Sequence, residues 1–92
     1  MFQLTGFQRD LLFVIASLDQ PSGQTIKQVL EEDFDEVNHG RLYPNLDTLV
    51  NRSLVEKGQL DRRTNYYQIT EKGLELLRER RTWENQLVDF FE

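Results

Sequence analysis

The segment 38–70, NHGRLYPNLDTLVNRSLVEKGQLDRRTNYYQIT, constrains the fold more than any other part of this chain. It begins with leucines at helical spacing, separated by polar residues, as in an amphipathic helix. A short hydrophobic strand, a turn with adjacent arginines and a second strand rich in tyrosine follow. The rest of the chain therefore has to support one amphipathic helix that leads directly into a hairpin with a basic tip.

Two further helices are predicted ahead of this segment. Thr5 is a good N-cap for the first, whose apolar residues recur at three-to-four spacing. Proline and glycine in the segment 19–23 predict the turn that ends it. Thr25 stands three residues before Gln28, which is a capping-box pattern, and predicts a second helix over about residues 26–34.

The central helix is predicted to begin after Asn38, a favourable N-cap, and to end near residues 51–53. Pro44 lies inside it, where proline removes a hydrogen bond and crowds the carbonyl of Gly40. We therefore expect either an irregular first turn or a bend at Pro44.

The hairpin and a last helix complete the predicted order of elements. Its strands cover residues 54–60 and 65–70, where β-forming residues dominate. Thr70 then caps a helix that we expect to continue to Glu92 despite Gly73. The predicted fold class is α+β and mostly helical: a winged helix-turn-helix with a two-stranded wing and a long C-terminal helix.

The charge of the chain is unevenly distributed. Its formal net charge is −5, whereas DNA-binding proteins are usually basic. Residues 37–70, however, hold five basic and three acidic side chains, a net charge of +2, and the segments on either side are net negative. Arginine outnumbers lysine eight to three, which together with the acidity fits a high-salt cytoplasm, although a mesophilic acidic regulator would give the same counts. We interpret the carboxylates of residues 31–36 as a solvated helix end rather than a metal site.

One polar row of the central helix has the chemistry for reading base edges. Arginine binds guanine bidentately, asparagine binds adenine and threonine contacts the thymine methyl group. A solvated polar face would show the same pattern, so this row alone leaves both interpretations open. The predicted DNA-binding residues of the helix are Arg41, Asn45, Thr48 and Arg52, with Asn38 and His39 at its start.

The hairpin turn favours DNA binding over the alternative of a polar surface that contacts only solvent. Arg62 and Arg63 are held away from the core, where guanidinium groups can contact phosphates or enter a minor groove. Thr64 and Asn65 add neutral donors, and we expect Tyr66 to present its hydroxyl to the backbone of the duplex while its neighbour packs inward. We therefore predict a DNA-binding domain over residues 1–70.

Two motifs, GRLYPNLDTLVNRSLVEKG and NYYQITEKGLELL, resemble those of the PadR-like transcriptional regulators. The resemblance implies a winged-helix fold, a homodimer, and a repressor or related regulator whose DNA binding can respond to a small-molecule effector. The chain departs from the family in its acidity, and it resembles the short branch without an extra C-terminal domain. The matching residues are Leu42, Tyr43, Pro44 and Leu46 in the helix core, and Tyr67, Thr70 and Gly73 at the junction between wing and last helix.

The last helix, residues 71–92, is predicted to be a dimerisation helix that forms one compact unit with the domain before it. Apolar residues share one of its faces, opposite to charged ones. A helix of about twenty residues reaches roughly 30 Å, beyond what so small a core can cover, so a second subunit is the expected cover. The predicted dimerisation residues are Leu76, Leu77, Trp83, Leu87, Phe90 and Phe91, with Phe2 and Leu4 as further contributors.

The sequence argues against several other classes of protein. It has no cysteine, one histidine and no glycine-rich phosphate loop, so we expect neither an enzyme nor a bound cofactor. No apolar run approaches membrane-spanning length, and the N-terminus lacks the features of a signal peptide, which predicts a cytoplasmic protein. The alternative function is a winged-helix adaptor that binds proteins rather than DNA.

Overall fold

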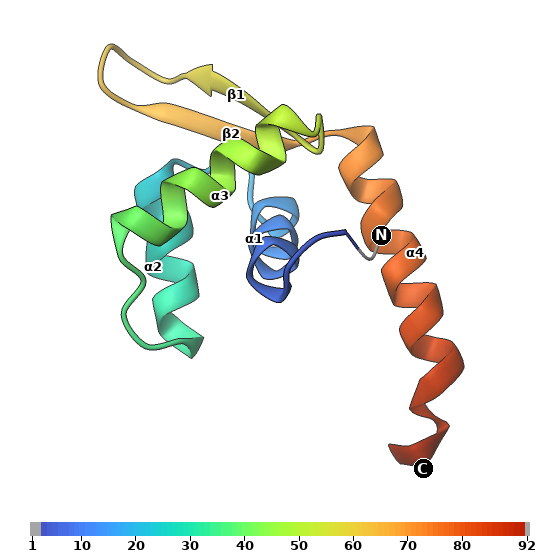
Figure 1. Ribbon diagram of the computed structural model, residues 1–92. Helices are drawn as coiled ribbons and strands as arrows, with labels where there is room; N and C mark the ends of the chain where they lie inside the picture. The colour runs from blue at the N-terminus through green and yellow to red at the C-terminus, as the bar shows by residue number, and fades with distance from the viewer. Residues whose placement is uncertain (1–2, 92) are drawn as a thin grey trace.

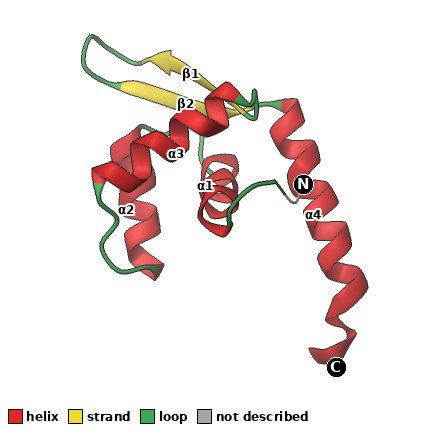
Figure 2. Cartoon of the chain, viewed as in Figure 1, coloured by secondary structure: helices red, strands yellow, loops and turns green. Residues whose placement is uncertain are grey.

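The computed structural model describes residues 3–91 of the chain. These residues form four α-helices, a two-stranded antiparallel sheet and a short 3-10 turn (Figures 1 and 2). This order of three helices, hairpin and long helix confirms the predicted winged helix-turn-helix. The elements are α1 (Gly6–Ser17), α2 (Gly23–Asp33), α3 (His39–Asn51), β1 (Val55–Gln59), β2 (Asn65–Ile69), α4 (Glu71–Leu87) and η1 (Val88–Phe91).

Helix starts are set by side-chain caps, and three of the four predicted caps are confirmed. Thr5 and Gln8 form a capping box at the start of α1, and Asn38 and Thr70 cap α3 and α4. The predicted cap of α2, Thr25, is wrong. Ser22 caps this helix, because its hydroxyl accepts a hydrogen bond from the Thr25 amide at 3.1 Å. The helix therefore begins at Gly23, three residues earlier than expected.

Two other details concern the ends and the continuity of the predicted helices. Pro44 lies inside α3, which is continuous from His39 to Asn51, so the proline does not divide the helix. The bond that proline removes would have gone to the carbonyl of Gly40, an exposed residue in the first turn that water can reach. The last α-helix ends at Leu87 and continues as the 3-10 turn η1, and the predicted end at Glu92 lies outside the described residues.

The core lies where α1 meets the other elements, and Figure 1 shows α1 in the middle of the fold. Each leucine that is fully buried contributes about 1.5–3 kcal/mol relative to an exposed one. The leucines of α3 face this core, which fixes which side of that helix is left for a partner. The buried side chains are Leu4, Leu11, Leu12, Ile15, Ile26, Leu30, Val37, Leu42, Leu46, Leu49, Leu54, Val55, Tyr67 and Leu77.

A close junction connects the hairpin to α4. The Thr70 amide donates to the Leu54 carbonyl at 3.0 Å, and its hydroxyl donates to the Ser53 carbonyl at 2.7 Å. A Cβ atom on Gly73 would overlap the same Leu54 carbonyl, so only glycine permits this approach. The junction fixes the direction in which α4 leaves the domain.

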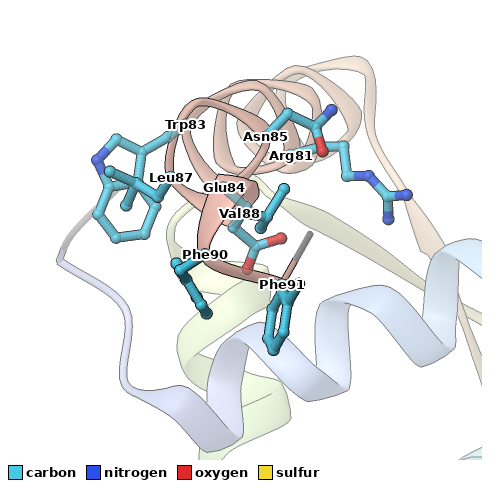
Figure 3. A pocket seen from close by; sticks show the side chains of 8 residues that line it. All are labelled: Arg81, Trp83, Glu84, Asn85, Leu87, Val88, Phe90 and Phe91. Carbon is cyan, nitrogen blue, oxygen red and sulfur yellow. The ribbon is translucent and has the colours of Figure 1, made fainter.

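Beyond Leu77, α4 extends away from the rest of the fold (Figure 1). The molecule is accordingly elongated, with extents of 49 × 29 × 22 Å. Leu87, Phe90 and Phe91 are exposed on this part, the two phenylalanines by 72% and 79%. Figure 3 shows Trp83 and Leu87 together on one side of the helix, with Phe90 and Phe91 nearby. Trp83 is half-buried, with the Arg80 guanidinium 4.6 Å from its ring centroid, whereas Leu87, Phe90 and Phe91 remain exposed in the described chain.

Candidate nucleic-acid interface

The outward side of α3 is opposite to its buried leucines. With 3.6 residues per turn, a second set of positions lies on the side of the helix opposite Leu42, Leu46 and Leu49. All of them are exposed, and one of them is the proline of the LYP motif. The outermost residues of α3 are Gly40, Pro44, Asp47 and Asn51.

The base-reading row predicted from the sequence lies to one side of this outermost line, toward the N-terminal segment. The Arg41 guanidinium lies 3.9 Å from the centroid of the Phe7 ring. The Asn45 side chain accepts a hydrogen bond from the Gln8 amide at 3.0 Å, and Arg52 donates to the Gln3 carbonyl at 3.4 Å. We call Arg41, Asn45, Thr48 and Arg52 the polar flank.

The amide of Asn45 is bonded at both ends. Its oxygen accepts from Gln8, and its nitrogen donates to the Arg41 carbonyl at 2.7 Å. Gln8 in turn accepts from the Thr5 amide at 3.1 Å. This chain of hydrogen bonds assigns the oxygen and the nitrogen of both amides and holds α3 against α1. Thr48 is closer to the outward side, and its hydroxyl donates to the Pro44 carbonyl at 3.1 Å.

The residues at the start of α3 have structural partners as well. The Asn38 side chain accepts from the Arg41 amide at 2.9 Å, which is its capping bond. The exposed ring of His39 stacks on Tyr43 with centroids 5.4 Å apart. Both residues remain accessible from solvent. Their capping and stacking roles are compatible with a partner on the outward side of the helix.

The wing tip, residues 60–64, is shaped by Asp61. Its carboxylate accepts hydrogen bonds from the backbone amides of Arg63 at 2.8 Å and Thr64 at 2.9 Å. The bond from the Arg63 amide is the main cause that lowers the pKa of Asp61 below its usual 3.8. Asp61 thus binds the backbone rather than a guanidinium. Arg62 and Arg63 are exposed and form no ion pair with any of residues 3–91.

The two tyrosines of β2 alternate as predicted. Tyr67 is buried, with 1% of its surface exposed, whereas Tyr66 is half-buried. The ring of Tyr66 covers Gly58 of β1, where a Cβ atom would overlap it. Thr64 and Asn65 are half-buried at the start of this strand. The hydroxyl that was expected to face DNA therefore sits on a side chain that also packs against the sheet.

A hollow of about 230 Å³ separates the start of α2 from the wing. Arg63 and the aromatic rings of Tyr43 and Tyr67 line it together with the first turn of α2. Arg63, Thr64 and Asn65, which the sequence predicts to bind DNA, also line this hollow, but no sequence pattern predicts the hollow itself. Its only signal would have been the glycine after Ser22, because a Cβ atom on Gly23 would lie 2.6 Å from the Tyr43 hydroxyl.

Other kinds of site find little support in the described chain. No group of three or more histidine or carboxylate side chains in residues 3–91 is placed to hold a metal ion. No helix of the described chain is both long and apolar enough to span a membrane.

Comparisons with known proteins agree with this geometry. The model of the PadR-like transcriptional regulator family matches residues 11–79. RosR of H. salinarum is 46% identical and has a TM-score of 0.88, with 96% of this chain and 81% of that chain covered. A PadR-like transcription factor from Bacteroides fragilis is 25% identical, with a TM-score of 0.78 and coverage of 94% and 89%.

A more distant structure shows the fold alone. FabT of Streptococcus pneumoniae, solved in complex with DNA, is 18% identical with a TM-score of 0.75, and covers 97% of this chain and 60% of its own. No curated protein matches the chain. The family model and the similarity to RosR are sufficient for an assignment: the chain belongs to the PadR-like transcriptional regulator family.

Proposed function

We propose that this chain is a sequence-specific double-stranded DNA-binding regulator that acts as a cytoplasmic homodimer and represses transcription. The observation that carries the proposal is the pair of guanidinium groups at the wing tip. In a protein of net charge −5, Arg62 and Arg63 extend from a turn whose only nearby carboxylate, within residues 60–64, is already bonded to the backbone. Two unpaired cations next to a helix with an exposed outward side fit a polyanion.

Helix α3 and the wing have different roles in the proposed DNA contact. Helix α3 enters the major groove with its outward side, and the polar flank lies along one edge of that groove. Arg41 and Asn45 read bases from a position fixed by Phe7 and Gln8. The wing tip contacts the phosphate backbone or a minor groove and supplies affinity that does not depend on sequence.

The exposed end of α4 supports the proposal of a homodimer. Leu87, Phe90 and Phe91 present apolar surface that a monomer would leave in water. A second copy that crosses this helix would cover the surface and would bring two α3 helices into one molecule. A symmetric dimer then places them in successive major grooves, with half-sites roughly 34 Å apart or a multiple of that distance. In such a dimer, residues 1–70 are the DNA-binding domain and residues 71–92 the dimerisation helix.

The rival proposal is a protein-binding adaptor with the same fold. An adaptor has no need for unpaired arginines at a wing tip. Fluorescence titrations separate the two, with a duplex selected from a random library and an unselected duplex, each at low and high salt. We expect tighter binding to the selected duplex and affinity for both that falls with salt. Equal affinity for both duplexes would contradict sequence-specific regulation, and no affinity for either would favour the adaptor.

A further inference from the structure

Asp47 places a negative charge on the outward side of α3. The other three outermost residues of this helix are uncharged. The side chain of Asp47 is exposed, so it lies where the proposed duplex approaches. The arginines of the helix, Arg41 and Arg52, belong to the polar flank. Helix α3 therefore presents cations along one edge and a carboxylate on the side that enters the groove.

The protein itself gives the Asp47 carboxylate no structural role. It forms no ion pair and accepts no hydrogen bond within residues 3–91. Side chains three or four positions away along a helix can pair with a carboxylate, but on α3 none of these positions holds a cation. The residues there are Tyr43, Pro44, Val50 and Asn51. An ion pair that stabilises the helix does not explain this charge.

The carboxylate lies on the side of α3 that is nearer to the wing. Burial raises the pKa of the Tyr67 hydroxyl, and the charge of Asp47 raises it further, so the two groups lie near each other. Tyr67 belongs to β2, whereas Phe7 and Gln8, which hold the polar flank, belong to α1. Asp47 and the polar flank thus lie on opposite sides of the outermost line of α3. They can therefore contact different base pairs of one groove.

A carboxylate at this place opposes binding to a duplex unless it meets a hydrogen-bond donor. The phosphates on both edges of the major groove repel it. An ionised carboxylate can only accept hydrogen bonds, and most polar groups in the floor of the groove are acceptors as well. The donors there are the amino groups of cytosine and adenine. The base opposite Asp47 is therefore selected partly by repulsion of the others.

Cytosine meets this requirement better than adenine does. The amino group of adenine lies between two acceptors, its own N7 and the O4 of the paired thymine. The amino group of cytosine has an acceptor on one side only, the O6 of the paired guanine. A carboxylate that accepts from adenine would face two repulsive neighbours, whereas one that accepts from cytosine faces one. Charge and hydrogen bonding together favour cytosine.

We propose that Asp47 is a specificity-determining residue whose carboxylate accepts a hydrogen bond from the N4 amino group of one cytosine in each half-site. The inference rests on the proposed function, because it needs α3 in the major groove. Asp47 is not among the DNA-binding residues predicted from the sequence, and it adds an acceptor to the donors of the polar flank. Its charge also lowers the affinity for duplexes without this cytosine, so Asp47 raises specificity while it lowers general affinity.

The variant Asp47→Asn keeps the shape of the side chain and replaces the carboxylate by an amide. Asparagine binds adenine through N6 and N7. Selection from a random library of duplexes should therefore give cytosine at one position of each half-site for the unmodified protein, and adenine there for the variant. We expect the preference at this position to change by about tenfold, with the other positions unchanged. Identical selected sequences for both proteins would overturn the proposal.

Modified cytosines test the hydrogen bond itself. In a base pair, N4-methylcytosine places its methyl group where the amino hydrogen faces the groove. At the selected position it should weaken binding by the unmodified protein by about tenfold, and it should not weaken binding by Asp47→Ala. A duplex with 5-methylcytosine keeps the amino hydrogen and controls for the added bulk. If N4-methylcytosine weakened both proteins equally, the carboxylate would not contact this amino group.

A matched variant separates the position of the charge from the net charge. Glu32→Gln removes one negative charge from an exposed side chain of α2, as Asp47→Asn removes one from α3. Only Asp47→Asn should tighten binding to an unselected duplex, by roughly fivefold. Its melting temperature should stay unchanged, because the carboxylate has no bond within residues 3–91 to lose. Equal tightening by both variants would contradict the position of Asp47 in the groove.

The selection experiment also separates this inference from the proposed function. If the unmodified protein selects a motif that Asp47→Asn leaves unchanged, the role of Asp47 is refuted and the DNA-binding regulator is retained. If the unmodified protein selects no sequence at all, both proposals are refuted.

Discussion

The polar flank of α3 and the wing tip both carry arginines, but they hold them in opposite ways. On the flank, the guanidinium of the exposed Arg41 stacks on the Phe7 ring, and the Asn45 amide is bonded at both ends. At the wing tip, Asp61 fixes the backbone and leaves the guanidinium groups of Arg62 and Arg63 in solvent. Fixed donors suit the reading of bases, where geometry decides, and free cations suit phosphates, where charge decides.

The largest expected effect comes from separating the subunits, because a monomer would present one flank and one wing tip instead of two. Trp83→Ala combined with Phe90→Ala should yield a monomer and weaken duplex binding by about 100-fold or more through lost bivalency. Sedimentation and duplex titration measure the two results. A monomer for the unmodified chain at micromolar concentration would rule out the proposed dimer.

A pair of matched variants separates base reading from support within the flank. Asn45→Ala should cost about 1–3 kcal/mol of binding to the selected duplex and relax the preference at particular base pairs. Gln8→Ala removes the partner of Asn45 but not Asn45 itself, and should cost about 0.5–1.5 kcal/mol of folding stability with less change in preference. Arg41→Ala should resemble Asn45→Ala.

Binding to selected and unselected duplexes, with denaturant unfolding as the control, distinguishes these outcomes. If Asn45→Ala weakened both duplexes equally, the flank would only support α3. The outward residues, among them Pro44 and Asp47, would then be the only ones of α3 that face the bases.

The smallest effect concerns the pH dependence of the wing tip. The hydrogen bonds lower the folded pKa of Asp61 below 3.8, so the stability they give is present above that value. It should be lost as the pH falls through the lower folded pKa. Amide resonances of Arg63 and Thr64 should therefore shift on acidification with a midpoint below 3.8. A midpoint at or above 3.8 would show that Asp61 does not hold the turn.

Local patterns in the sequence were sufficient to predict the fold. Caps at Thr5, Asn38 and Thr70, leucine spacing in α3 and alternating tyrosines in β2 each depend on neighbours within a few residues, and the structure confirms them. The N-terminus of α2 was misplaced because Ser22 and Thr25 are both good caps, and only the packing of the turn decides between them.

The sequence alone does not predict which residues surround the polar flank. The amphipathic pattern separates buried leucines from polar residues, but it does not show which polar side faces another helix. Gln8 and Asn45 are 37 residues apart, and their contact depends on how α1 packs against α3. For the same reason, the hollow that joins Gln24, Tyr43 and Tyr67 has no local signature.

The salt dependence of duplex binding is the most direct test of the wing tip as a free cationic contact. Arg62→Ala combined with Arg63→Ala should lower the slope of log affinity against log salt by about one unit for each lost phosphate contact, for every sequence. Sequence preference and folding stability should stay nearly unchanged, because neither side chain is part of the core. An unchanged slope in the folded double variant would contradict the DNA contact and favour an adaptor.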